Sequence, residues 1–262
     1  MGIKRTLRPS EEQVRRNVHK NIRFGVEQVN FHMPQSTPIV LCAGGPSLKP
    51  NIETVRQQQI EGAEVICVGN AGHLLAGYGI KPNGHILMDG MDRNKTFVVP
   101  IPDTRYFVAS QCDPSVIRSM KVHNHVYIWH ASGPPGIREI LDKHYGPGNY
   151  WLIPGGSYIS LRAIALLHVL GYKWIHIYGL DSCLMEDEHH SYLQPDADGQ
   201  TVEDVTVGDR DFRCTYWMLD QATQFLESIQ NGLFGSAQLA VHGDGPISYM
   251  LKSGHGPTWR LF

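Results

Sequence analysis

Several features are absent from this sequence of 262 residues, and each absence excludes a class of protein. No apolar run approaches the roughly 20 residues that a membrane-spanning helix requires, and the chain does not open with a secretory signal. With 23 Lys and Arg against 25 Asp and Glu, no excess of positive charge is available to hold nucleic acid or anionic membrane. We therefore expect a cytoplasmic protein without a membrane partner and without a strong nucleic-acid signal.

Cysteine is also scarce, and no two cysteines form a C-x-x-C pair. The five are odd in number and widely spaced, at Cys42, Cys67, Cys112, Cys183 and Cys214. Cys42 and Cys67 lie inside apolar, strand-like runs, so we expect them to be small buried hydrophobic residues in a reducing compartment.

Neither of the two common phosphate-binding signatures is present. The glycine-rich stretch LCAGGPSL, residues 41–48, lacks the Lys-Ser/Thr of a Walker loop and does not fit G-x-G-x-x-G. It does lie between an apolar strand-like run and a helical stretch, where backbone N–H groups are suited to phosphate. Phosphate binding is therefore expected at Gly44, Gly45, Pro46 and Ser47, with a plain tight turn as the alternative.

Apolar runs of strand length alternate along the chain with helical patterns. Strands are expected within residues 37–46, 63–71, 83–90, 104–114, 125–133, 173–181 and 237–245. Helices are expected within residues 10–29, 51–62, 72–79, 157–172 and 214–232, and a helix or turn within residues 246–254. Ser10 is the expected N-cap of the first helix. Residues 133–156 predict a loop or lid with at most one or two helical turns, and residues 182–212 a second loop.

This alternation predicts an α/β fold with a doubly wound, mostly parallel, Rossmann-like sheet. We expect an N-terminal helical segment over residues 1–35 and a single nucleotide-dependent domain over residues 36–262, with loops that form the site. In such folds ligands bind at the carboxyl ends of the strands.

Polar residues follow several of the expected strands and so belong to this same edge. Asn70 is placed to hydrogen-bond a ribose or base, unless it only satisfies a local turn. Asp89 and Asp92 can face one cation, and Mg²⁺ is the metal that carboxylates and substrate phosphates hold together. A solvated acidic turn, with Asp92 paired to Arg93, is the alternative.

A second anion-binding end is expected at the start of the central helix. Gly156 and Ser157 occur in GGSY, immediately before the apolar stretch ISLRAIALLHVLGY. The positive end of the helix dipole favours an anion there. The alternative is that these residues only cap the helix.

Five motifs occur in a fixed order over roughly residues 36–195: VLCAGGPSL, VICVGNAGHLLAGYGIKPNGHILMD, SQCDP, GGSYISLRAIALLHVLGYKWIHIYGLD and HHSY. Together they resemble the family that joins MptE-like 6-hydroxymethylpterin diphosphokinases and motility-accessory-factor (Maf) flagellin glycosyltransferases. They are more distantly similar to bacterial CMP-sialic-acid sialyltransferases. The resemblance implies a nucleotide at the Gly-Pro-Ser turn, reached by Asn70, and leaves the transferred group open.

In a glycosyltransferase of this kind, His189 or His190 would be the general base that removes the proton of the acceptor hydroxyl. Tyr192 would hydrogen-bond the departing phosphate, and Asp181 would hold a substrate hydroxyl or orient a histidine. The alternative is that both histidines are solvent-exposed loop residues.

The sequence therefore supports three hypotheses. The leading one is a glycosyltransferase with a small-molecule nucleotide-activated donor. The second is an Mg²⁺-dependent diphosphokinase that transfers diphosphate from ATP to a hydroxymethyl-pterin-like acceptor through Asp89 and Asp92. The third is a nucleotide-binding protein without catalysis. The acceptor stays open, and a homo-oligomer is compatible with all three.

Overall fold

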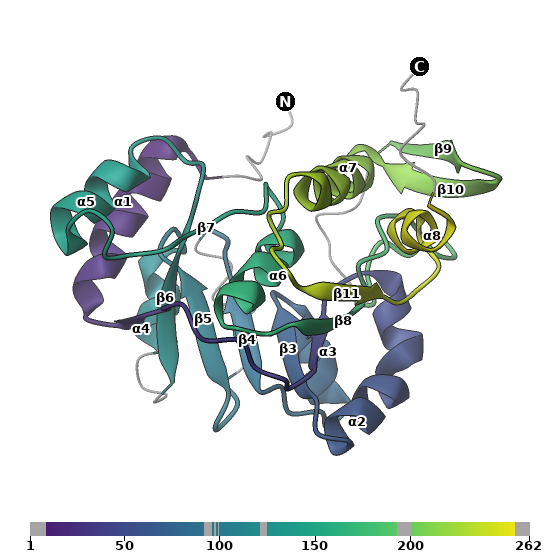
Figure 1. Ribbon diagram of the computed structural model, residues 1–262, viewed down its shortest axis with the longest axis horizontal. Helices are drawn as coiled ribbons and strands as arrows, with labels where there is room; N and C mark the ends of the chain where they lie inside the picture. The colour runs from purple at the N-terminus through teal and green to yellow at the C-terminus, as the bar shows by residue number, and fades with distance from the viewer. Residues whose placement is uncertain are drawn as a thin grey trace, which may run out of the picture.

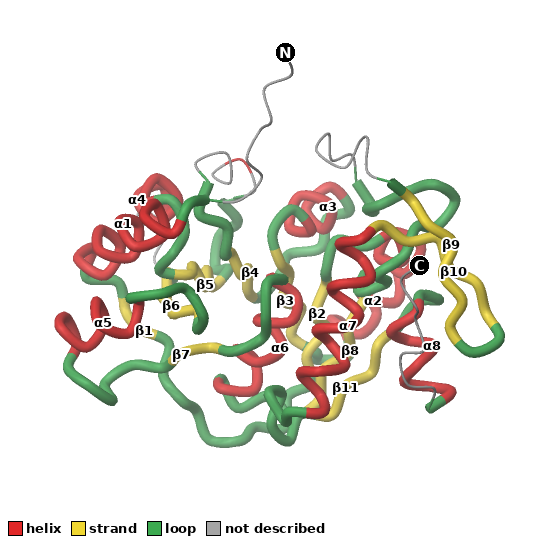
Figure 2. The backbone as a smooth tube through the Cα atoms, turned by 90° about the horizontal axis from the view of Figure 1, so that it is seen from above, coloured by secondary structure: helices red, strands yellow, loops and turns green. Residues whose placement is uncertain are grey.

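A computed structural model describes residues 9–91, 96, 98, 100–120, 125–192 and 201–254. They form a Rossmann-like α/β fold with one central sheet and helices on both of its faces (Figures 1 and 2). The sheet contains nine strands in the order β1-β6-β5-β4-β3-β2-β8-β11, and β7 pairs with β6. Every pairing in it is parallel, which confirms the predicted fold class.

Seven strands lie where the sequence predicts them: β2 Ile39–Cys42, β3 Glu64–Val68, β4 Gly84–Leu87, β5 Arg105–Ala109, β6 Val126–Ala131, β8 Trp174–Tyr178 and β11 Gln238–Val241. Two short strands join them, β1 Glu27–Gln28 and β7 Leu152–Ile153. The helices are α1 Glu11–Asn21, α2 Ile52–Ile60, α3 Ala71–Gly77, α4 Pro114–Met120, α5 Ile137–Tyr145, α6 Ile159–Val169, α7 Tyr216–Gln230 and α8 Pro246–Ser253. Two 3₁₀ helices are η1 Ile22–Phe24 and η2 Pro46–Asn51.

The alternation of side chains along β2 explains why both faces of the sheet carry helices. Ile39 and Leu41 belong to the larger core, which includes the buried residues of α6, whereas Val40 and Cys42 pack with residues of α2 and α3. All four residues of β2 are buried, as expected for a strand covered on both faces. Figure 2 shows α3 and α6 on opposite sides of the row of strands.

Helix α1 is anchored to the edge of the sheet where the strands end. Ser10 caps it as predicted, because its side chain accepts a hydrogen bond from Gln13 N at 3.2 Å. On its buried face, Asn17 Nδ2 donates to Gly90 O at 3.1 Å, and Asn21 Nδ2 donates to Ser110 O at 2.8 Å. These side chains satisfy carbonyls beyond the ends of β4 and β5, so α1 closes one side of the edge where a ligand would bind.

The predicted loop over residues 133–156 is wrong in part, since it contains the nine-residue helix α5. Its Gly and Pro residues obscure an amphipathic pattern in which Ile137, Ile140 and Leu141 are buried at helical spacing. Helix α4 was not predicted. Within the predicted loop over residues 182–212 the chain enters an antiparallel hairpin of β9 Val202–Val207 and β10 Arg210–Thr215.

All five cysteines are buried free thiols, as expected for Cys42 and Cys67. Burial raises the pKa of each of these thiols. Within the part of the chain that the structure describes, no helix combines the length and the apolar character needed to cross a bilayer.

Two buried histidines make the fold sensitive to acid. Burial lowers the pKa of His85 and of His130 from 6.5 to about 4. The unfolded chain therefore binds more protons than the folded chain between these pH values, and stability falls as pH falls from 6.5 to 4. The expected loss in the free energy of unfolding is on the order of 3 kcal/mol for each histidine. Urea unfolding at a series of pH values measures it.

A variant with His85→Gln should lose the contribution of His85 to the pH dependence of stability, because glutamine does not titrate. The fold should be kept, since the amide can still donate to Gly69 O in place of His85 Nε2. The exposed His19→Gln in α1 is the matched control and should keep the slope of the wild type. An unchanged slope in His85→Gln would contradict the assignment.

Candidate functional site

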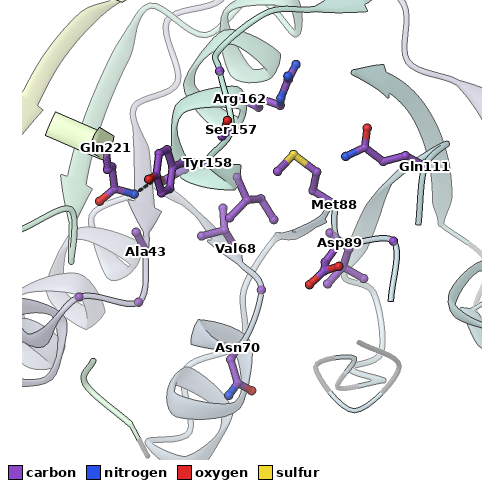
Figure 3. Close-up of a pocket in the computed structure, with 18 of the residues that line it drawn as sticks. Ala43, Val68, Asn70, Met88, Asp89, Gln111, Ser157, Tyr158, Arg162 and Gln221 are labelled. Carbon is purple, nitrogen blue, oxygen red and sulfur yellow. Dashed lines mark hydrogen bonds between the residues drawn. The ribbon is translucent and has the colours of Figure 1, made fainter. Parts of the chain in front are cut away.

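A cleft of about 990 Å³ runs along the carboxyl ends of the strands from β2 and β8 to β6 (Figure 3). It brings together most of the residues that the sequence predicts for the site: Gly44, Gly45, Pro46, Asn70, Asp89, Gly156, Ser157, Asp181, His189, His190 and Tyr192. Ser47 is buried and does not line the cleft, and Asp92 lies outside the described residues. This edge of an open α/β sheet is where ligands bind in such folds.

The glycine turn is joined tightly to the end of β8. Gly45 N donates to Gly179 O at 2.8 Å, and Gly179 N donates to Ser47 Oγ at 3.2 Å. A Cβ atom on Gly45 would lie 2.5 Å from Asp181 Oδ2 and 2.6 Å from Gly179 O. The close approach of β8 therefore already requires glycine at position 45, independently of any phosphate.

Asp181 holds this joint from the β8 side. Its side chain is 2 % exposed, and Oδ2 accepts a hydrogen bond from Ser47 N at 2.9 Å. Burial raises the pKa of Asp181. The other oxygen, Oδ1, is buried without a hydrogen-bond partner among the described residues. The contacts of Asp181 thus point to positioning of the turn, whereas its predicted contact with a substrate hydroxyl or a histidine stays a prediction.

Ser191 fastens the histidine-bearing loop to the glycine turn. Its N–H donates to Gly44 O at 3.0 Å, and its hydroxyl donates to Gly45 O at 2.6 Å. The same hydroxyl accepts from Lys49 N at 3.1 Å. Ser191 was not among the predicted site residues, although its place in HHSY between two candidate residues was a signal.

His190 is oriented by the turn. Its Nδ1 lies 3.3 Å from Gly44 O, and a carbonyl only accepts, so we assign the ring hydrogen to Nδ1. Nε2 then carries the lone pair that can take up a proton. Burial lowers the pKa of His190 below 6.5, which keeps the ring neutral at pH 7. His190 therefore has the tautomer and the charge state of a general base.

Tyr192 covers the turn beside His190. The two rings stack with centroids 5.4 Å apart and an angle of 4° between their planes. The hydroxyl of Tyr192 lies too close to the position of a Cβ atom on Gly44, so any larger residue at position 44 would displace the Tyr192 side chain. Burial raises the pKa of Tyr192, and its neutral hydroxyl can donate a hydrogen bond to an anion.

The start of α6 is braced by α7. Ser157 N donates to Gln224 Oε1 at 2.8 Å, and Tyr158 Oη donates to Asp220 Oδ2 at 2.7 Å. The Ser157 amide, predicted to bind an anion, is therefore engaged within the chain, and Gly156 adopts a left-handed φ of 71° beside it. Figure 3 shows Tyr158 next to Gln221 on the side of the cleft formed by α7.

Asn70 and Asp89 line the cleft at the ends of β3 and β4 (Figure 3). The Asn70 side chain does not cap α3. One oxygen of Asp89, Oδ1, accepts from Met91 N at 3.0 Å, and none of the described residues donates to Oδ2. Among the described residues, no three His, Cys, Asp or Glu side chains gather at one point. One carboxylate with substrate phosphates still fits the way in which proteins bind Mg²⁺.

The cleft wall also contains Arg162, which the sequence analysis did not select. It is the one charged residue in the apolar helix α6, and it is 8 % exposed. A charge inside an otherwise apolar helix was the signal in the sequence. By contrast, the aromatic residues Tyr145, Tyr150 and Trp151 of the Gly- and Pro-rich segment do not line the cleft.

The amino-acid sequence matches the model of a known protein family. The model of the family "6-hydroxymethylpterin diphosphokinase MptE-like" matches residues 12–187, which is more than half of the chain. None of the curated proteins matches.

A solved structure shares the fold. A Maf glycosyltransferase from Magnetospirillum magneticum AMB-1 superposes with a TM-score of 0.70 at 19 % identity, over 90 % of this chain and 36 % of that one. This chain thus spans about a third of the length of that protein. A mammalian sialyltransferase in complex with Gal-beta-1-3GalNAc-ortho-nitrophenol has a TM-score of 0.44 at 10 % identity, over 90 % of this chain and 81 % of that one. The predicted resemblance is confirmed at the family level: the chain belongs to the family described as "6-hydroxymethylpterin diphosphokinase MptE-like".

Proposed function

We propose that this protein is a transferase that moves a group from a nucleotide-activated donor to a hydroxyl acceptor, with His190 as the general base. The observation that carries the proposal is the hydrogen bond between His190 Nδ1 and Gly44 O, because it leaves Nε2 as a proton acceptor at the cleft. The lowered pKa of His190 supports the same role, since a base must be unprotonated at the working pH.

The leading candidate is a glycosyltransferase. The acceptor oxygen would attack the anomeric carbon of the donor sugar while its proton passes to His190 Nε2. The bond between that carbon and the phosphate oxygen would break, and the nucleotide would leave with the electron pair. The hydroxyl of Tyr192 would hydrogen-bond the departing phosphate, which is stabilised most where water is excluded.

The second candidate is a diphosphokinase, and the family match favours it. Here the acceptor oxygen would attack the β-phosphorus of ATP, and AMP would leave. Mg²⁺ would neutralise charge on the phosphates when bound, and Asp89 Oδ2 is the described carboxylate oxygen available to hold it. His190 would take the acceptor proton in this reaction as well.

Thermal unfolding with ATP, GTP, CTP, UTP, CMP and UDP, each with and without Mg²⁺, separates the candidates. A ligand present at about a hundred times its Kd stabilises by roughly 2.7 kcal/mol. A shift with CMP or UDP that does not need metal supports the glycosyltransferase. An Mg²⁺-dependent shift with ATP, together with AMP release on addition of a hydroxymethyl-pterin, supports the diphosphokinase. If no nucleotide shifts the transition, the proposal fails, and binding that never leads to turnover indicates a non-catalytic protein.

A further inference from the structure

Arg162 is a buried cation for which the described residues provide no counter-charge. Its side chain lines the cleft, and no carboxylate of the described residues lies within ion-pair distance of it. Burial lowers its pKa to about 10, so it is still charged at pH 7. Burying a charge without a partner of opposite sign is costly, and proteins retain such groups where a ligand compensates them.

The guanidinium has hydrogen-bonding capacity to spare. Nη1 donates to Ile153 O at 2.6 Å, and Nη2 donates to Ser132 O at 2.8 Å. These two bonds fix the plane of the group between β7 and the end of β6. Three of its five N–H groups have no acceptor among the described residues. A fixed fork of free donors suits the oxygens of a phosphate or diphosphate.

The first turn of α6 adds donors and a favourable field. Ile159, Ser160 and Leu161 are its first three residues, and their N–H groups have no partner within the helix. The hydroxyl of Ser160 accepts from Gln221 Nε2 at 3.1 Å, so its own hydrogen is available to donate. Helical side chains lean toward the N-terminus of their helix, which brings Arg162 level with this turn. The helix dipole favours negative charge at the same place.

We propose that Arg162 and the first turn of α6 form the anion subsite of the cleft and hold a phosphoryl group of the substrate. The identity of that substrate rests on the proposed function, but the subsite itself does not. It differs from the predicted site at the glycine turn, where the N–H groups of Gly45, Ser47 and Leu48 donate within the chain.

Binding of inorganic pyrophosphate tests the subsite directly, by calorimetry and by the shift in thermal unfolding. We expect the wild type to bind pyrophosphate and Arg162→Met to bind it about tenfold to a hundredfold more weakly, as for the loss of charged hydrogen bonds. Arg162→Lys should fall between them, because it keeps the charge but not the fork. Arg56→Met is the matched control, since Arg56 also donates to a carbonyl but lies outside the cleft.

Pyrophosphate affinity separates a ligand-binding role from a purely structural one. Arg162→Met removes a buried unpaired charge, but it also leaves the carbonyls of Ile153 and Ser132 without this donor, so the Tm of the free protein does not decide between the two roles. If Arg162 serves a ligand, the affinity for pyrophosphate falls whatever the change in Tm. If Arg162 only clamps β7 and β6, the Tm falls while pyrophosphate affinity stays at the wild-type value, and the proposal is overturned. Absence of pyrophosphate binding to the wild type overturns it too.

The variant His190→Ala tests anion binding at the subsite separately from the proposed catalysis. We expect this variant to bind pyrophosphate with wild-type affinity, because its contacts are with the glycine turn. If pyrophosphate binds through Arg162 but no nucleotide shifts the transition, the subsite stands and the proposed donor fails. If nucleotides bind equally well to the wild type and to Arg162→Met, the subsite falls and the proposed function stands.

Discussion

Replacing His190 by alanine should lower kcat on the order of 100- to 10,000-fold, the usual contribution of a positioned general base. The expected cause is the loss of Nε2 as proton acceptor, since Nδ1 is occupied by Gly44 O. Affinity for the nucleotide should change little, because the base acts on the acceptor. Steady-state rates and nucleotide titrations on the same preparations measure both quantities.

His189→Ala decides between the two adjacent histidines. His189 lines the cleft, but the structure ties only His190 to the turn, so we expect less than a tenfold loss for His189→Ala. A larger loss in His189→Ala than in His190→Ala would reverse the assignment.

The pH dependence of kcat/KM tests the role of His190 independently. Because burial lowers the pKa of His190, kcat/KM should be level above pH 6.5 and fall only as the pH decreases below it.

Gly45→Ala should destabilise the protein by about 1–3 kcal/mol, the range for overpacking a tight interior. The added methyl would lie 2.5 Å from Asp181 Oδ2 and 2.6 Å from the backbone oxygen of Gly179. Backbone strain does not contribute, since φ at Gly45 is −68°. Moving β8 away from the turn would also break the bond from Ser47 N to Asp181. Urea unfolding measures the loss.

Gly77→Ala is the matched control for this experiment. Gly77 is the last residue of α3, and a Cβ atom there meets nothing within 4 Å. That substitution should stabilise the protein by roughly 0.5–1 kcal/mol, because alanine restricts the unfolded chain and favours the helix. Wild-type stability in Gly45→Ala would contradict the prediction, because it would show that Gly179 and Asp181 leave room for a methyl group at position 45.

The fold could be predicted because its signals are local. The central strands are short runs of apolar, often β-branched residues such as those of β2, and their length and flanking turn residues separate them from helices such as α2. The wrongly predicted loop over residues 133–156 shows where local signals fail. Gly and Pro residues around α5 disguised a helix that is held by tertiary burial of Ile137, Ile140 and Leu141.

The candidate site could be predicted only as a set of residues at one edge. Since parallel strands end on the same side of a sheet, topology alone brings Gly44, Asn70, Asp89 and Asp181 to the cleft. Their contacts were beyond prediction, because these depend on segments more than a hundred residues apart. The bond from Ser47 N to Asp181 and that from Ser191 to Gly45 are of this kind.

The parallel sheet and the edge that carries the site follow from the amino-acid sequence, because apolar runs and the polar residues at strand ends are properties of short stretches. Three features depend on the packing of distant segments: the glycine turn is joined to the end of β8, His190 Nδ1 faces Gly44 O, and Arg162 is buried without a carboxylate partner among the described residues. Hydrogen-bond partners, desolvation and free space exist only once distant segments pack together, and these quantities set the chemistry of the cleft.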